Sequence, residues 1–165
     1  MADNRTTQSW GQGEGGLRRL IDEISALAAQ AQPGWRGTVR FVLRISADYA
    51  YIRPQDAWRP LRFLKQMAGV PPIQVGTDGF RADIVDDYNP ARHYMALLFI
   101  GFWLPRPLAW LTLYVWEIAG FIRYHGHWSQ PDIRCGLIGV RHGRLVRRYG
   151  PTVLPGLMAA ELSET

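Results

Sequence analysis

The chain has 165 residues, of which 47% are hydrophobic and 20% charged, and its formal net charge is +5. This composition excludes an intrinsically disordered chain, and the length is enough to bury one core without disulfide or metal staples. The only cysteine, Cys135, excludes an intrachain disulfide and a cysteine-based zinc site. We also expect no disulfide-linked partner.

The two ends of the chain differ from its middle. Residues 1–16 are polar and predict a flexible arm that binds a protein partner. Residues 17–150 are expected to form a helical domain, and residues 151–165 a C-terminal tail. The first residues have neither a basic region nor an apolar run, so they do not resemble a signal peptide. We therefore expect a cytoplasmic protein, with peripheral membrane association or export without a cleaved signal left open.

The first half predicts helices. In "LRRLIDEISALAAQAQ" the apolar residues recur every three or four positions from Leu17, which predicts an amphipathic helix ending near Pro33. The segment 37–54 alternates like a strand, but its arginines and Asp48 recur at every fourth position, and we expect a helix. A further helix is predicted over 55–69, followed by a long loop over 70–88.

The second half contains an apolar helical hairpin. Asn89 followed by a proline predicts a capped helix over 90–104, and a second helix is expected over 107–126 after the proline-rich "PRP". Ser129 and Asp132 have the spacing of a capping box and predict a third helix that ends near Gly143. The fold is therefore predicted to be mainly α-helical, one small domain around this hairpin.

The apolar stretch within 94–122 raises the alternatives of a membrane span and a buried core. Its uncharged runs, 94–105 and 107–116, are shorter than the roughly 18 residues that a span requires. We expect a helical hairpin covered by the flanking helices. A re-entrant or interfacial element remains the alternative, since four tryptophans would suit a membrane interface: Trp103, Trp110, Trp116 and Trp128.

Glu117 is the unusual residue of this stretch. On a regular helix it shares a face with aromatic residues, which would raise the pKa of its carboxyl group and make it a candidate general acid. An ion pair with Arg92 or Arg134, which would keep Glu117 ionised, is the interpretation that we favour from the sequence. His93 and Asp132, each near a predicted helix start, could be brought close to it.

The remaining polar residues predict binding more than chemistry. His125 and His127 have a spacing that metal sites use, but no third ligand follows at a familiar interval, so we expect neither a metal nor another cofactor. The basic run that contains Arg144, Arg147 and Arg148 is a candidate site for anionic lipid or nucleic acid. Three glycines spaced by three and four positions predict a small-residue face for close helix packing: Gly136, Gly139 and Gly143.

The order "NPARHY", an apolar hairpin with "EIAG", and "PDIRCGLIGVRHG" resembles the C-terminal domains of bacterial polymorphic toxins and related bacterial proteins, over residues 78–143. The resemblance implies a small helical effector-like domain that hydrolyses a cell-wall or nucleic-acid polymer. We expect catalytic roles for Glu117, His93 and Asp132, with Arg92 and Arg134 as supporting binding residues. The alternative is a non-enzymatic subunit, bound peripherally to a membrane or a protein complex.

Overall fold

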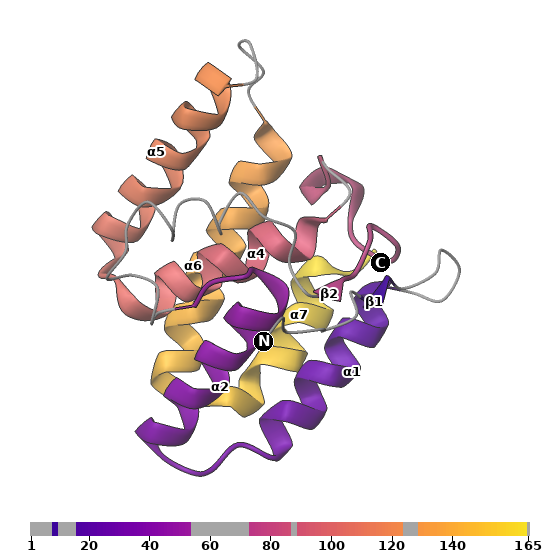
Figure 1. Cartoon of the computed structure of the whole chain (residues 1–165), viewed down its shortest axis with the longest axis vertical. Helices are drawn as coiled ribbons and strands as arrows, with labels where there is room; N and C mark the ends of the chain where they lie inside the picture. The colour runs from indigo at the N-terminus through magenta and orange to yellow at the C-terminus, as the bar shows by residue number, and fades with distance from the viewer. Residues whose placement is uncertain (1–7, 10–15, 54–72, 87–88, 124–128, 165) are drawn as a thin grey trace, which may run out of the picture.

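The computed structural model describes residues 8–9, 16–53, 73–86, 89–123 and 129–164, and confirms a mainly α-helical chain (Figure 1). The order of elements is β1 (Gln8–Ser9), α1 (Gly16–Ala29), α2 (Trp35–Tyr49), β2 (Ile73–Gln74), η2 (Ala82–Ile84), α4 (Pro90–Trp103), α5 (Arg106–Arg123), α6 (Gln130–Tyr149), η3 (Pro151–Val153) and α7 (Leu154–Leu162). The two short strands pair in parallel, with Gln8 opposite Ile73. The rest of the predicted arm lies outside the described residues, except Gly16, which begins α1; the predicted helix 55–69 also lies outside them.

Helices α4 and α6 form the centre of the fold, and glycines allow their backbones to approach. A Cβ atom on Gly139 or Gly143 would collide with backbone atoms of α4, and one on Gly101 would collide with the backbone at Val140. The predicted small-residue face is therefore confirmed. The helix does not end near Gly143 as predicted: it continues to Tyr149 and stops at Gly150, whose φ of 91° favours glycine.

The core lies where α1, α2 and α7 pack around this pair. The helix predicted within 37–54 is confirmed as α2. Its Phe41, Val42 and Ile45 are buried in the core, while its arginines are exposed. The predicted C-terminal tail is instead η3 and α7, which packs beside α1 (Figure 1). Its buried residues, spaced by four positions, all belong to the main core: Leu154, Met158 and Leu162.

The hairpin of α4 and α5 differs from the prediction in its packing. Helix α4 is central, but α5 lies at the periphery beside α6 (Figure 1), and most of its apolar side chains are exposed. The expectation that flanking helices cover the whole hairpin was therefore wrong. None of the helices in the described residues is both long enough and apolar enough to cross a bilayer.

Candidate functional site

Three polar side chains from three helices meet between α4, α5 and α6. His93 lies in the first turn of α4, Glu117 in the second half of α5, and Asp132 in the first turn of α6. Nε2 of His93 lies 3.9 Å from Oε1 of Glu117, and the candidate ligand atoms of all three residues lie within 4.8 Å of one another. The structure thus brings together the three residues that the sequence proposed as catalytic; we call them the His–Glu–Asp cluster.

Two local caps hold the helix starts that carry His93 and Asp132. Oδ1 of Asn89 accepts a hydrogen bond from the backbone N–H of Arg92 at 3.3 Å, and Oγ of Ser129 accepts one from the N–H of Asp132 at 3.1 Å. Both caps were predicted, and both satisfy amides that a helix start leaves without intrahelical partners. The two helix starts are therefore fixed by residues that directly precede them.

Gly136 provides the space beside His93. A Cβ atom at this position would lie 3.1 Å from Nε2 of His93 and 2.6 Å from Cδ1 of Leu113. Any larger residue at position 136 would thus displace the imidazole of His93 or the side chain of Leu113. The small size of Gly136 therefore lets α6 pack closely against the helices that carry His93 and Glu117.

Burial and neighbouring carboxylates determine the protonation of Glu117. Only 8% of its side chain is exposed, and burial disfavours the ionised form. The carboxylates of Asp132 and Asp86 act in the same direction, and together these effects raise the pKa of Glu117 from 4.5 to about 7. A carboxyl group with this pKa both holds and releases a proton near neutral pH.

Arg134, one of the two arginines expected to pair with Glu117, pairs with another carboxylate. Arg134 is exposed and pairs with Asp83, with Nη1 and Oδ2 3.3 Å apart, and Asp83 also receives two hydrogen bonds from Arg81. A cationic partner would lower the pKa of Glu117, whereas its pKa is raised. The raised pKa therefore favours the protonated form of Glu117 over an ion pair with Arg134.

The predicted basic surface contains arginines with different roles. Arg144 and Arg148 are exposed on α6. Arg147 is also exposed, but its guanidinium donates to the backbone carbonyls of Phe102 and Trp103, at 3.2 and 3.4 Å, at the end of α4. Arg147 therefore stabilises a helix end, a role that the sequence analysis did not predict.

A second polar constellation was missed in the sequence. The hydroxyl of Tyr94 lies 2.7 Å from Nδ1 of His142, and Nε2 of His142 lies 3.3 Å from Oε1 of Glu161. Tyr94 and His142 are fully buried between α4 and α6, and burial lowers the pKa of His142 to about 4. We assign this chain a structural role, as a polar link between α4, α6 and α7. The one available signal was the position of His142 next to Gly143 on the packed face of α6.

The His–Glu–Asp cluster is also the group of described residues that could hold a metal ion, through one imidazole nitrogen and two carboxylates. The earlier candidates His125 and His127 lie outside the described residues. Cys135 is buried in the main core, as expected for a small apolar residue. A pocket of about 190 Å³ lies away from the cluster, between the ends of α1 and α2, and is lined by residues that include Arg40 and Arg44.

Comparison of the chain with protein-family models, curated proteins and solved structures found no match. The His–Glu–Asp cluster combines a carboxyl group that is partly protonated at neutral pH with an imidazole and a second carboxylate. Such a set can donate a proton to a leaving group and accept one from water, which are the two proton transfers of hydrolysis.

Proposed function

We propose that this chain is a small effector-like or toxin-like hydrolase domain that acts on a cell-wall or nucleic-acid polymer. The observation that supports it best is the convergence of His93, Glu117 and Asp132 within 4.8 Å from three separate helices. Placing polar groups in a largely apolar surrounding costs free energy, so their assembly calls for a reason beyond packing. The substrate class comes from the resemblance of residues 78–143 to polymorphic-toxin domains.

The roles of the three residues follow from their surroundings. Glu117 is the proposed general acid, because it is the most buried of the three and carries a proton in much of the population near pH 7. His93 is the proposed partner that receives and returns protons, since its Nε2 lies 3.9 Å from Oε1 of Glu117. Asp132 raises the pKa of Glu117 and supports the transfer by its negative charge.

The test is hydrolysis of three polymers, namely peptidoglycan sacculi, RNA and DNA, by the full chain. We expect the purified protein to cleave one of them, and Glu117→Gln to reduce the rate by about 10²-fold or more because an amide cannot donate the proton. The matched control is Asp22→Asn, which removes an exposed carboxylate on α1 and should leave the rate unchanged. Cleavage that survives Glu117→Gln at full rate would contradict the assignment.

The second candidate function is a non-enzymatic subunit that binds peripherally to a membrane or a larger assembly. The observation that favours it is the exposed apolar surface of α5, because soluble monomeric proteins rarely expose large contiguous apolar patches. The two candidates differ in the consequence of Glu117→Gln. A subunit without chemistry should keep its binding in this variant, and no polymer should be cleaved by either protein.

A further inference from the structure

Among the side chains of helix α5 that the structure describes, only a narrow stripe is buried against the rest of the protein. The stripe consists of Ala109, Leu113 and Glu117, at successive fourth positions. Eight other large apolar residues of this helix are between 38% and 58% exposed: Leu108, Trp110, Leu111, Tyr114, Val115, Trp116, Ile118 and Phe121. We call these eight residues the outer face of α5. A helix that is apolar around most of its circumference needs a second apolar environment besides the protein.

The outer face has an internal order. Because successive residues of a helix are about 100° apart, Leu108, Leu111, Val115 and Ile118 form an aliphatic strip opposite the buried stripe. Aromatic residues flank the aliphatic strip: Trp110, Tyr114 and Phe121 on one side, Trp116 on the other. The aliphatic side chains thus project furthest from the protein, and the tryptophans and the tyrosine lie closer to its surface. This is the order of depth in a bilayer interface, where tryptophan and tyrosine lie at the level of the head groups.

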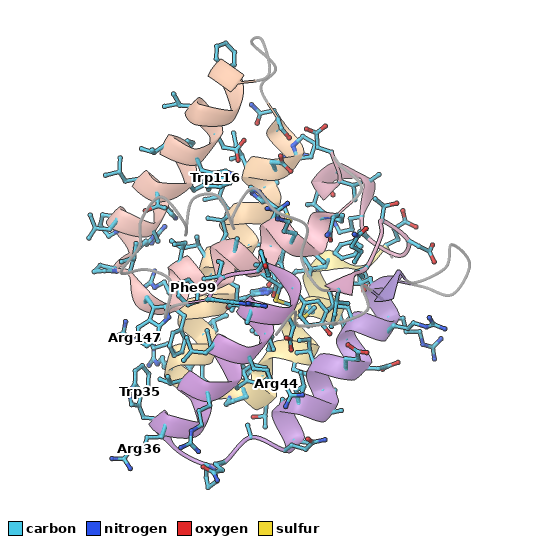
Figure 2. The ribbon with its side chains drawn as sticks, in the orientation of Figure 1. Trp35, Arg36, Arg44, Phe99, Trp116 and Arg147 are labelled. Carbon is cyan, nitrogen blue, oxygen red and sulfur yellow. The ribbon has the colours of Figure 1, made fainter. Side chains whose placement is uncertain are left out.

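Two arginines lie near the start of this helix. The guanidinium of Arg106, the first residue of α5, lies 4.3 Å from the ring centroid of Trp110. Arg147 contacts the end of α4 directly before it, where the exposed rings of Trp35 and Trp103 pack together. Figure 2 shows Trp35, Arg36 and Arg147 on the same side of the molecule as the outward-facing side of α5.

The acidic charge of α5 is turned away from this surface. Glu117 is the only acidic residue in the α5 sequence, and it belongs to the buried stripe. The first and last residues of the helix are arginines, and the chain as a whole has a net charge of +5. A partner with a negatively charged surface above an apolar interior would complement both the cations and the aliphatic strip.

We propose that the outer face of α5 docks into the interfacial layer of an anionic phospholipid bilayer, with the helix parallel to the membrane plane. Leu111 and Val115 then reach the acyl chains, while Arg106 and Arg147 meet the lipid phosphates. A protein partner would satisfy the apolar surface equally well, but it would not by itself account for aromatic flanks beside an aliphatic centre. The proposal does not depend on the proposed hydrolase function, because the His–Glu–Asp cluster lies on the opposite, protein-facing side of α5.

The experiment measures binding of the full chain to two kinds of vesicle, one of phosphatidylcholine alone and one of phosphatidylcholine and phosphatidylglycerol in equal parts. We expect the protein to sediment with the anionic vesicles, and salt to weaken this binding. Replacing three residues of the aliphatic strip, Leu111→Ser, Val115→Ser and Ile118→Ser, should lower the partition about tenfold or more. The matched control is the pair Ala26→Ser and Ala29→Ser, two exposed positions of α1, which should bind like the wild type.

A second measurement reports on α5 without removing its apolar surface. Since Cys135 is buried, a cysteine introduced as Val115→Cys is the accessible thiol for an environment-sensitive fluorophore, and Ala26→Cys is its control. We expect a blue shift on adding anionic vesicles at position 115 only. Equal shifts at both positions, or none, would overturn the proposal. It would also fail if the triple variant bound vesicles like the wild type, or if that variant instead abolished a dimer formed without lipid.

Discussion

The substitution Glu117→Gln removes the charge of a buried carboxyl group and keeps its shape. Burial and the neighbouring carboxylates raise the pKa of Glu117 from 4.5 to about 7 in the folded protein. The folded state therefore binds this proton more tightly than the unfolded state. The stabilisation that comes from protonating Glu117 is complete below pH 4.5 and is lost as the pH rises through 7. The whole shift corresponds to about 3 kcal/mol.

The variant should consequently be more stable than the wild type in alkaline solution. We expect the two proteins to have similar free energies of unfolding near pH 4.5, and the variant to exceed the wild type by up to about 3 kcal/mol at pH 8. Urea unfolding, followed by circular dichroism at a series of pH values, measures the difference directly. The exposed control Asp22→Asn should show no such trend.

Two results would refute this reasoning. A difference between wild type and variant that does not change with pH would mean that Glu117 does not titrate with a raised pKa. A variant that is less stable by about 3 to 5 kcal/mol at pH 8 would mean that a buried cation has lost its partner, as in the arginine ion pair considered from the sequence. In that case Glu117 would be a structural residue.

Three further predictions concern packing and charge. Burial lowers the pKa of His142 from 6.5 to about 4, so the folded state binds this proton less tightly than the unfolded state. In Glu117→Gln, where Glu117 no longer titrates, the free energy of unfolding should therefore fall by at most about 3 kcal/mol as the pH falls from 6.5 to 4. NMR of the imidazole resonances should follow this titration. Gly143→Ala should cost about 3 kcal/mol or more because its Cβ would collide with the backbone of α4, whereas Gly156→Ala, with open space around it, should be neutral or slightly stabilising in thermal melts. Arg147→Ser should cost about 1 kcal/mol through its lost hydrogen bonds, and Arg144→Ser close to nothing, by the same urea measurement.

Features that depend on neighbouring residues were predicted well from the sequence. The starts of α4 and α6 follow from Asn89 and Ser129, whose side chains accept hydrogen bonds from N–H groups only three residues further on. The mainly helical class follows from the spacing of apolar positions within single segments, and the helical state of 35–49 follows from the fourfold spacing of its arginines and Asp48. His93, Glu117 and Asp132 were likewise proposed together, although nothing in their sequence positions fixed the distances between them.

Features that depend on distant parts of the chain required the tertiary structure. Glycine at position 143 resembles a helix end, but α6 continues through it because the backbone of α4 occupies the space of a side chain. The apolar residues of 154–162 and of α5 look equally suited to a core. Yet α7 is buried beside α1, and α5 leaves its outer face exposed. A sequence pattern shows that a face is apolar, whereas burial depends on which other segments the folded chain brings against it.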